Sequence, residues 1–194
     1  MPENFALYLE VQSRVTLDTL DEVITEVRNR LASTGDSLFS EAALSTFTNP
    51  LEEVHGWLTV SASEMATKAD LKFLYAEMNG FDINTDRWFS DLFGYSREID
   101  YRDAYELSQY DTGVANMQST LTLTGMEPMQ HAFEWWGDNE QLRSTYADAE
   151  TLAQLLVECR FIELLRNACA VGPLEPDVPL AAAAHDSEMV LRLR

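Results

Sequence analysis

The hydrophobic pattern near the start of the chain changes from one period to another. Phe5, Leu7 and Val11 fall on one side of an alternation over residues 5–12, which is typical of a half-buried strand. Over residues 17–31 the apolar positions instead recur at helical spacing and stop before Gly35. We therefore expect a strand followed by a helix.

The next segments predict a second strand and more helices. Residues 55–63 alternate as a strand would, and residues 64–78 carry apolar side chains at helical spacing. Thr85 can cap a short helix with a dense aromatic face. Residues 95–112 fit either a helix or an ordered loop, because acidic residues lie on both sides of their aromatic positions.

The second half of the chain contains the clearest helical pattern. Residues 118–124 alternate Thr and Leu as in a strand, and Pro128 suits the first turn of a helix that Gly137 interrupts. Residues 144–170 carry a long apolar stripe and predict the longest helix. Residues 189–193 predict a final edge strand.

These elements predict an α+β fold. We expect a single compact domain over residues 1–172, in which a small, mostly antiparallel sheet packs against several helices, with a long helix in the C-terminal half. Residues 173–194 are expected to form a Pro-rich connector and a C-terminal tail that contains the edge strand. The alanine run at 181–184 is too short to predict an element.

The charge of the chain sets it apart from an average globular protein. It has 33 Asp and Glu against 13 Lys and Arg, a formal net charge of −20. Residues 81–111 interleave eight carboxylates with eight aromatic rings, and residues 103–142 contain no Lys or Arg. Such a surface repels nucleic acid and anionic membranes but attracts a basic partner, for which exposed rings would supply apolar anchors.

Cysteine usage and the length of the apolar runs indicate the compartment. Cys159 and Cys169 fall on the long predicted helix, where a rise of about 1.5 Å per residue separates them too far for a disulfide. No leader-like segment opens the chain, and no apolar run approaches the roughly 20 residues of a membrane span. We expect a cytoplasmic protein.

Signatures of catalysis or metal binding are incomplete. Glu127, His131 and Glu134 would share a helix face, where they could orient a metal or shuttle a proton. A di-metal bundle needs Glu-x-x-His on two helices, whereas this order is reversed and occurs once. Asp82, Asn84 and Asp86 alternate like the start of a calcium loop, but the glycine and the late glutamate of such a loop are missing at the required offsets. We therefore expect no metal and no cofactor, and we favour a non-catalytic protein.

The leading hypothesis is a non-catalytic inhibitor or adaptor whose carboxylate-rich surface mimics nucleic acid and blocks a basic site on a partner. Restriction or CRISPR-type defence machinery is one class of target. Helical carboxylates three or four residues apart have Cβ atoms about 5–6 Å apart, a spacing comparable to that of phosphates along DNA. The partner would be a basic protein surface, such as that of a nucleic-acid-binding protein, with no direct contact to nucleic acid or membrane. The expected partner-binding residues are Asp82, Asp86, Asp91, Glu98, Asp100, Tyr101, Asp103, Tyr105, Glu106, Tyr110 and Asp111.

Two alternatives and the oligomeric state stay open. A small enzyme could assemble its site from isolated polar residues such as His131, Glu134 and Asp138. A housekeeping protein of a salt-loving organism would be acidic throughout, and residues 1–100 carry 18 acids and 7 bases while residues 101–194 carry 15 and 6. The hypotheses differ in whether the rings of residues 81–111 face the core or a partner.

Overall fold

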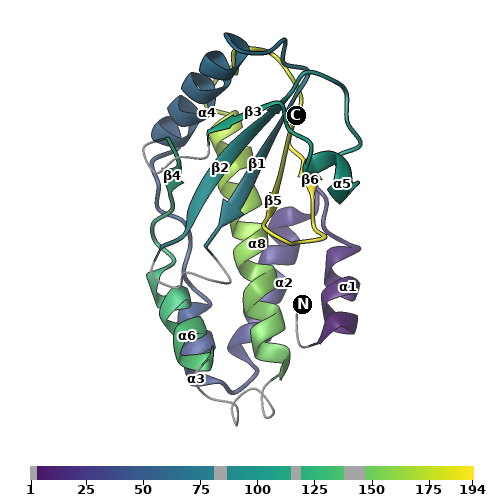
Figure 1. Cartoon of the computed structure of the whole chain (residues 1–194). Coiled ribbons are helices and arrows are strands. Elements are labelled where there is room, and N and C mark those ends of the chain that lie inside the picture. Colours follow the sequence, from purple (N-terminus) through teal and green to yellow (C-terminus); the bar gives the residue numbers. More distant parts are fainter. Residues whose placement is uncertain (1–3, 81–86, 115–118, 138–146) are drawn as a thin grey trace.

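A sheet lies against one long helix, α8 (Ala147–Cys169), and other helices pack around that helix (Figure 1). The computed structural model describes residues 4–80, 87–114, 119–137 and 147–194. The strands follow the order β3-β2-β1-β5-β6, and β4 pairs with β2. The predicted α+β class is confirmed. The sheet is mixed rather than mostly antiparallel, because β5 runs parallel to β1.

Helices form the first third of the chain, and a hairpin of two strands follows them. The helices besides α8 are α1 (Phe5–Gln12), α2 (Leu20–Ala32), α3 (Ser37–Ala42), α4 (Leu51–Ala66), α5 (Ala104–Leu107) and α6 (Glu127–Gly137). The strands are β1 (Phe73–Asn79), β2 (Phe89–Tyr95), β3 (Thr112–Val114), β4 (Leu121–Thr122), β5 (Leu180–Ala184) and β6 (Leu191–Arg192).

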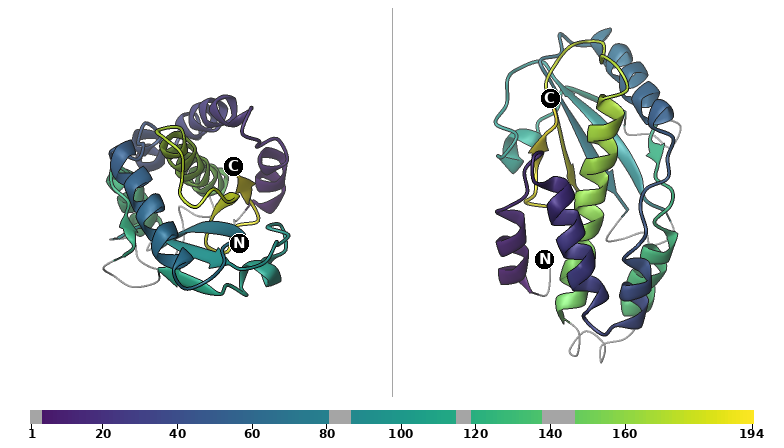
Figure 2. Two further views of the ribbon diagram at one scale, coloured as in Figure 1. Left: turned by 90° about the horizontal axis from the view of Figure 1, so that it is seen from above. Right: turned by 180° about the vertical axis from the view of Figure 1, so that it is seen from behind.

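The long helix α8 is enclosed on nearly all sides. It lies between the sheet and α2 (Figure 2), and Leu155, Leu156 and Ile162 have no exposed surface. Each such side chain contributes about 1.5–3 kcal/mol relative to an exposed position. The prediction of a long helix over residues 144–170 is confirmed for the part that the structure describes. Among the described helices, none combines the length and the apolar character that crossing a bilayer requires.

The strand predicted at the start of the chain is wrong, because these residues form α1. The side chain of Asn4 caps this helix by accepting a hydrogen bond from the N–H of Leu7 at 3.1 Å. Leu7, Tyr8 and Val11 are buried, and this spacing places them on one helix face. The apolar residues of this segment therefore fit both the two-residue period of a strand and the 3.6-residue period of a helix. The helix predicted over residues 17–31 is confirmed as α2, which begins at Leu20.

In the middle of the chain, helix and strand are exchanged relative to the predictions. Residues 55–63 were expected to form a strand but lie in α4, whose Leu58 and Met65 are buried. Residues 73–78, the end of an expected helix, form β1. The short helix expected after Thr85, which itself lies outside the described residues, is replaced by β2. Both strands are buried on both faces, so neither has the polar alternation of a half-exposed strand.

The C-terminal segment contributes strands to the sheet. Residues 181–184, for which no element was predicted, belong to β5, which lies between β1 and β6 and is buried throughout. Of the strand expected over residues 118–124, the described residues 119–124 contain the short strand β4. The helix expected after Pro128 is confirmed as α6. Residues 189–193 contain the expected edge strand, β6.

A buried carboxylate on α8 joins three parts of the fold. Glu158 is 1% exposed, and the hydroxyls of Tyr8 and Ser187 donate to its Oε2 at 2.9 and 3.1 Å. The amide of Gln154 donates to Oε1 at 3.3 Å. Burial raises the pKa of Glu158 to about 7, although the three hydrogen bonds oppose this shift. The cluster connects α8 with α1 and with the turn between β5 and β6.

The wild type is expected to lose stability as the pH rises from 4.5 to about 7, and we expect Glu158→Gln to abolish this loss. Between pH 4.5, the ordinary pKa, and about 7, folded Glu158 keeps a proton that the unfolded chain has lost, so the free energy of unfolding falls as the pH rises. The variant keeps an oxygen acceptor but does not ionise. Across this window its stability should rise relative to the wild type by on the order of 3 kcal/mol. Urea denaturation at constant ionic strength measures this difference, and Glu22→Gln is the exposed control. A difference that stays constant with pH would contradict the prediction.

Candidate functional site

The two faces of the sheet carry different side chains. One face packs on α8 and belongs to the main hydrophobic core, whereas the rings on the other face form a separate cluster. We call this second side the outer face. Side chains alternate along a strand, so every second residue of each strand belongs to it. On β1, β2 and β5 the outer face comprises Phe73, Tyr75, Glu77 and Asn79 of β1, Phe89, Asp91, Phe93 and Tyr95 of β2, and Ala181 and Ala183 of β5.

One end of the outer face is covered by the chain that follows β2. Tyr101 stacks on Phe73 with ring centroids 6.3 Å apart and planes inclined by 11°. Ile99 and Leu107 pack on the same cluster, and the hydroxyl of Tyr95 donates to the Leu107 carbonyl oxygen at 2.6 Å. Residues 95–112, expected to be a helix or an ordered loop, thus contain the single-turn helix α5 within an ordered loop.

A cavity of about 750 Å³ lies beside the other end of the outer face. Three rings form a row along it: the centroids of Tyr75 and Phe93 are 6.3 Å apart, and those of Phe93 and Tyr110 are 4.6 Å apart. The turn after β5 and the residues around α5 complete the lining. The charged or titratable groups besides tyrosine in this lining are Glu77, Arg102, His185, Asp186 and Glu188.

Two carboxylates face each other next to this cavity. Glu77 and Asp91 are direct partners across β1 and β2, which puts their Cβ atoms about 4.5–5.5 Å apart. His185 Nδ1 lies 3.0 Å from Glu77 Oε1, and Asn79 Nδ2 donates to Asp91 Oδ2 at 2.9 Å. Asp91 is only 8% exposed, and no described residue donates a hydrogen bond to its Oδ1.

The electrostatics of this pair are unfavourable. Burial, followed by the charge of Glu77, raises the pKa of Asp91 to about 6, and the hydrogen bond from Asn79 only partly opposes this. Burial also raises the pKa of Tyr75, together with the charge of Glu77 and a hydrogen bond to it. Within the described residues, neither carboxylate has a Lys or Arg within 4.0 Å. A perturbed carboxyl group beside a cavity is a common property of functional sites.

The expected partner-binding residues after β2 belong to residues 96–111, which we call the acidic segment. Glu98, Asp100 and Asp103 are exposed, and none of them forms an ion pair with a described residue. Asp103 caps α5 by accepting a hydrogen bond from the Tyr105 N–H at 2.9 Å. The segment also borders the cavity, because residues of α5 and residues that follow it form part of the cavity lining.

The rings of the acidic segment divide between the core and the surface. Tyr105 and Tyr110 are 72% and 49% exposed, whereas Tyr101 is half-buried against Phe73. Among the described rings that precede the segment, Trp88, Phe93 and Tyr95 are buried and Phe89 is partly buried. The acidic segment therefore presents two tyrosines beside unpaired carboxylates.

The remaining expected site residues have different surroundings. Glu106 is paired with Arg97 at 3.1 Å. Two hydrogen bonds from Ser96, the backbone one first, lower the pKa of Asp111. Asp91 lies on the outer face near the cavity rather than on the exposed segment. Asp82 and Asp86 lie outside the described residues.

Three residues of the cavity region were missed by sequence reasoning: Glu77, Asn79 and His185. The first two belong to a strand that was expected to be a helix, and His185 lies in the segment expected to be a tail. One signal was available, because Glu77 interrupts an otherwise apolar run. A carboxylate in a buried strand needs a partner or a function.

The residues suggested for an enzyme do not form an enclosed site. The side chains of His131 and Glu134 on α6 are 70% and 64% exposed, with Nδ1 and Oε2 4.0 Å apart. Asp138 lies outside the described residues. Within the described part of the chain, no three His, Cys, Asp or Glu side chains are grouped so that they could hold a metal ion.

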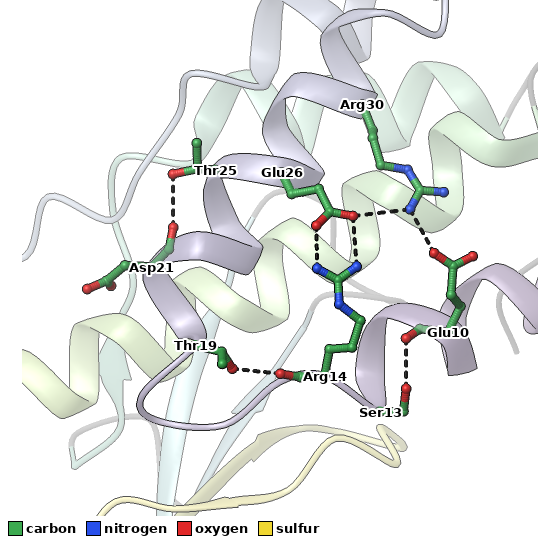
Figure 3. Close-up of polar contacts among 8 residues, drawn as sticks. All are labelled: Glu10, Ser13, Arg14, Thr19, Asp21, Thr25, Glu26 and Arg30. Atoms are coloured by element: carbon green, nitrogen blue, oxygen red, sulfur yellow. Dashed lines mark hydrogen bonds and ion pairs between the residues drawn. The ribbon is translucent and has the colours of Figure 1, made fainter.

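Ion pairs with arginine hold the carboxylates between α1 and α2. Arg14 Nη1 donates to Glu26 Oε1 at 2.9 Å, and Arg30 Nη1 lies 3.2 Å from Glu10 Oε1 (Figure 3). A hydrogen bond from Arg14 is the largest effect that lowers the pKa of Glu26. These carboxylates form ion pairs within the chain, in contrast to Glu98, Asp100 and Asp103 of the acidic segment, which form none with a described residue.

Asp91→Asn should stabilise the protein above the acidic range. The pKa of folded Asp91, about 6, lies above its ordinary value of 3.8, so the free energy of unfolding falls as the pH rises between these values. The amide removes the repulsion with Glu77 and still accepts from Asn79. Near pH 7.5 we expect the free energy of unfolding to increase by about 1–3 kcal/mol. Urea denaturation tests this expectation, and a loss of stability at that pH would contradict it.

Comparison with known proteins adds no constraint on this surface. No family model, no curated protein and no solved structure matches the chain. The cavity and the acidic segment are therefore interpreted from their own residues.

Proposed function

We propose that this chain is a non-catalytic inhibitor or adaptor that binds a basic protein surface through its acidic segment. The observation that carries the proposal is the exposure of Tyr105 and Tyr110 beside Glu98, Asp100 and Asp103, three carboxylates with no ion pair among the described residues. Unpaired charge attracts a basic partner over long distances, and exposed aromatic rings supply contact area once the surfaces meet.

The partner site would be one that normally holds nucleic acid. Such a groove carries Lys and Arg side chains arranged to neutralise phosphates. An acidic surface fixed on a folded scaffold can occupy the same groove without the entropy loss of an unstructured polyanion. The net charge of −20 speeds association with a basic groove and opposes direct binding to nucleic acid. Nucleases of restriction or CRISPR-type defence systems are the target class that we propose.

We also propose a cytoplasmic location. Cys159 and Cys169 are both free thiols on α8, and Cys159 is buried in the core. Thiols that remain reduced are usual in the cytoplasm, where disulfides are rare.

A competition assay tests the proposal. A purified restriction endonuclease and a CRISPR effector nuclease are each bound to fluorescein-labelled duplex DNA, and this protein is titrated in at low ionic strength. We expect displacement of the DNA from at least one nuclease, seen as a fall in fluorescence anisotropy. The displacement should weaken steeply as salt is added, because the steering is electrostatic.

Charge-neutral variants locate the surface that acts. The triple variant Glu98→Gln, Asp100→Asn, Asp103→Asn should weaken displacement about ten-fold, because it removes three exposed charges and keeps an N-cap residue before α5. The matched control, Asp18→Asn, Glu22→Gln, Glu41→Gln, removes three exposed charges elsewhere and should change displacement much less. Equal losses in both triples would indicate nonspecific charge, and the absence of displacement from either nuclease would refute the proposal.

A further inference from the structure

We propose that the cavity beside the outer face receives the guanidinium group of an arginine side chain from the bound partner. This inference rests on the proposed function, because the arginine would belong to a protein seated on the acidic segment. It assigns separate roles to the two surfaces. The acidic segment attracts the partner, and the cavity fixes its position by one buried side chain.

The row of rings along the cavity is suited to a planar cation. Tyr75 and Phe93 are inclined by 25° with centroids 6.3 Å apart, and the Phe93 and Tyr110 centroids are 4.6 Å apart. A guanidinium group stacks on such rings and is attracted by their negative faces. The volume of about 750 Å³ lies in the usual range of ligand pockets.

Glu77 lines the cavity and Asp91 lies behind it as its cross-strand partner, and neither carboxylate has a Lys or Arg within 4.0 Å among the described residues. Glu77 and Asp91 face each other directly, and the imidazole of His185 is the titratable base that contacts Glu77. Asp91 is more than nine-tenths buried, and among the described residues nothing donates to its Oδ1. A guanidinium group has five N–H donors and a delocalised charge, so one group that hydrogen-bonds Glu77 also offsets the charge of Asp91 next to it.

The position of the cavity connects it to the acidic segment. Ala104, Leu107, Ser108 and Tyr110 belong to that segment and also line the cavity. An arginine projecting from a partner on the exposed face of α5 would therefore enter beside Tyr110. This continuity favours a partner's side chain over a free small cation.

Arg102 is the one arginine among the cavity-lining residues. It lies over the Tyr101 ring at 5.4 Å from the centroid, on the wall formed by the acidic segment. Its charge opposes a second guanidinium in the same cavity. Neutralising Arg102 should therefore tighten binding, an effect in the opposite direction from that of general damage to the site.

Direct binding is tested with N-acetyl-arginine amide, with the neutral isostere N-acetyl-citrulline amide as the matched ligand. Titrations are followed by backbone and aromatic NMR shifts of the intact protein. We expect the arginine compound to bind with a Kd on the order of 1 mM and to shift Tyr75, Phe93 and Tyr110. The citrulline compound should bind at least about ten-fold more weakly, because it lacks the charge.

Two variants and a control separate the site from the rest of the surface. Asp91→Asn should weaken arginine binding about five-fold or more even though it stabilises the fold, whereas Arg102→Gln should strengthen binding about two- to three-fold. Glu22→Gln on α2 should leave binding unchanged. In the nuclease competition assay, Asp91→Asn should also weaken DNA displacement.

The outcomes distinguish the two proposals. Equal shifts from both compounds, or shifts outside the cavity only, would overturn the guanidinium site whether or not DNA is displaced. Arginine binding in the cavity without displacement of DNA would support the guanidinium site and contradict the proposed function. If Asp91→Asn weakens arginine binding but leaves displacement unchanged, the site does not receive a partner's arginine and this inference fails.

Discussion

The enclosure of α8 is the constraint on which the rest of the structure depends. A helix that is apolar around most of its circumference must be covered on all sides, and here the sheet, α2 and α4 provide that cover. The small alanines of β5 let its strand lie close to α8 while it pairs with β1. One face of the sheet is thereby committed to the core. The outer face is left available for other chemistry.

The outer face combines features that oppose stability. Two carboxylates face each other across β1 and β2, and one of them is nearly excluded from water. A core optimised only for stability would place apolar residues there, because buried charge without a counter-ion is costly. Perturbed carboxyl groups of this kind cluster at functional sites, where stability is commonly sacrificed for activity. The row of rings next to the carboxylates is also suited to a cationic ligand, because ring faces attract a cation.

The acidity of the chain is divided into matched and unmatched charge. Between α1 and α2, carboxylates form ion pairs with Arg14 and Arg30, so their field is largely cancelled within the chain. On the acidic segment, only Glu106 has an arginine partner among the described residues. A charge that forms no ion pair in the free protein can attract an oppositely charged partner without first breaking an internal contact. The distribution of ion pairs thus distinguishes the surfaces better than the net charge does.

The sequence by itself determined the elements whose pattern has a single interpretation. In α2 and α6 the apolar residues recur at helical spacing, the apolar stretch of α8 is too long for an ordinary strand, and the excess of acid is a property of composition. Only the tertiary structure decided between helix and strand for residues 5–12, 55–63 and 73–78. Residues 73–78 form a strand that is buried on both faces and carries no diagnostic period, whereas in the other two segments exposed apolar side chains such as Phe5, Leu9 and Val60 obscure the helical period. It also brought Glu77, Asp91 and His185 together. Strand pairing over long sequence separation fixes that contact, and local spacing along the chain contains no record of it.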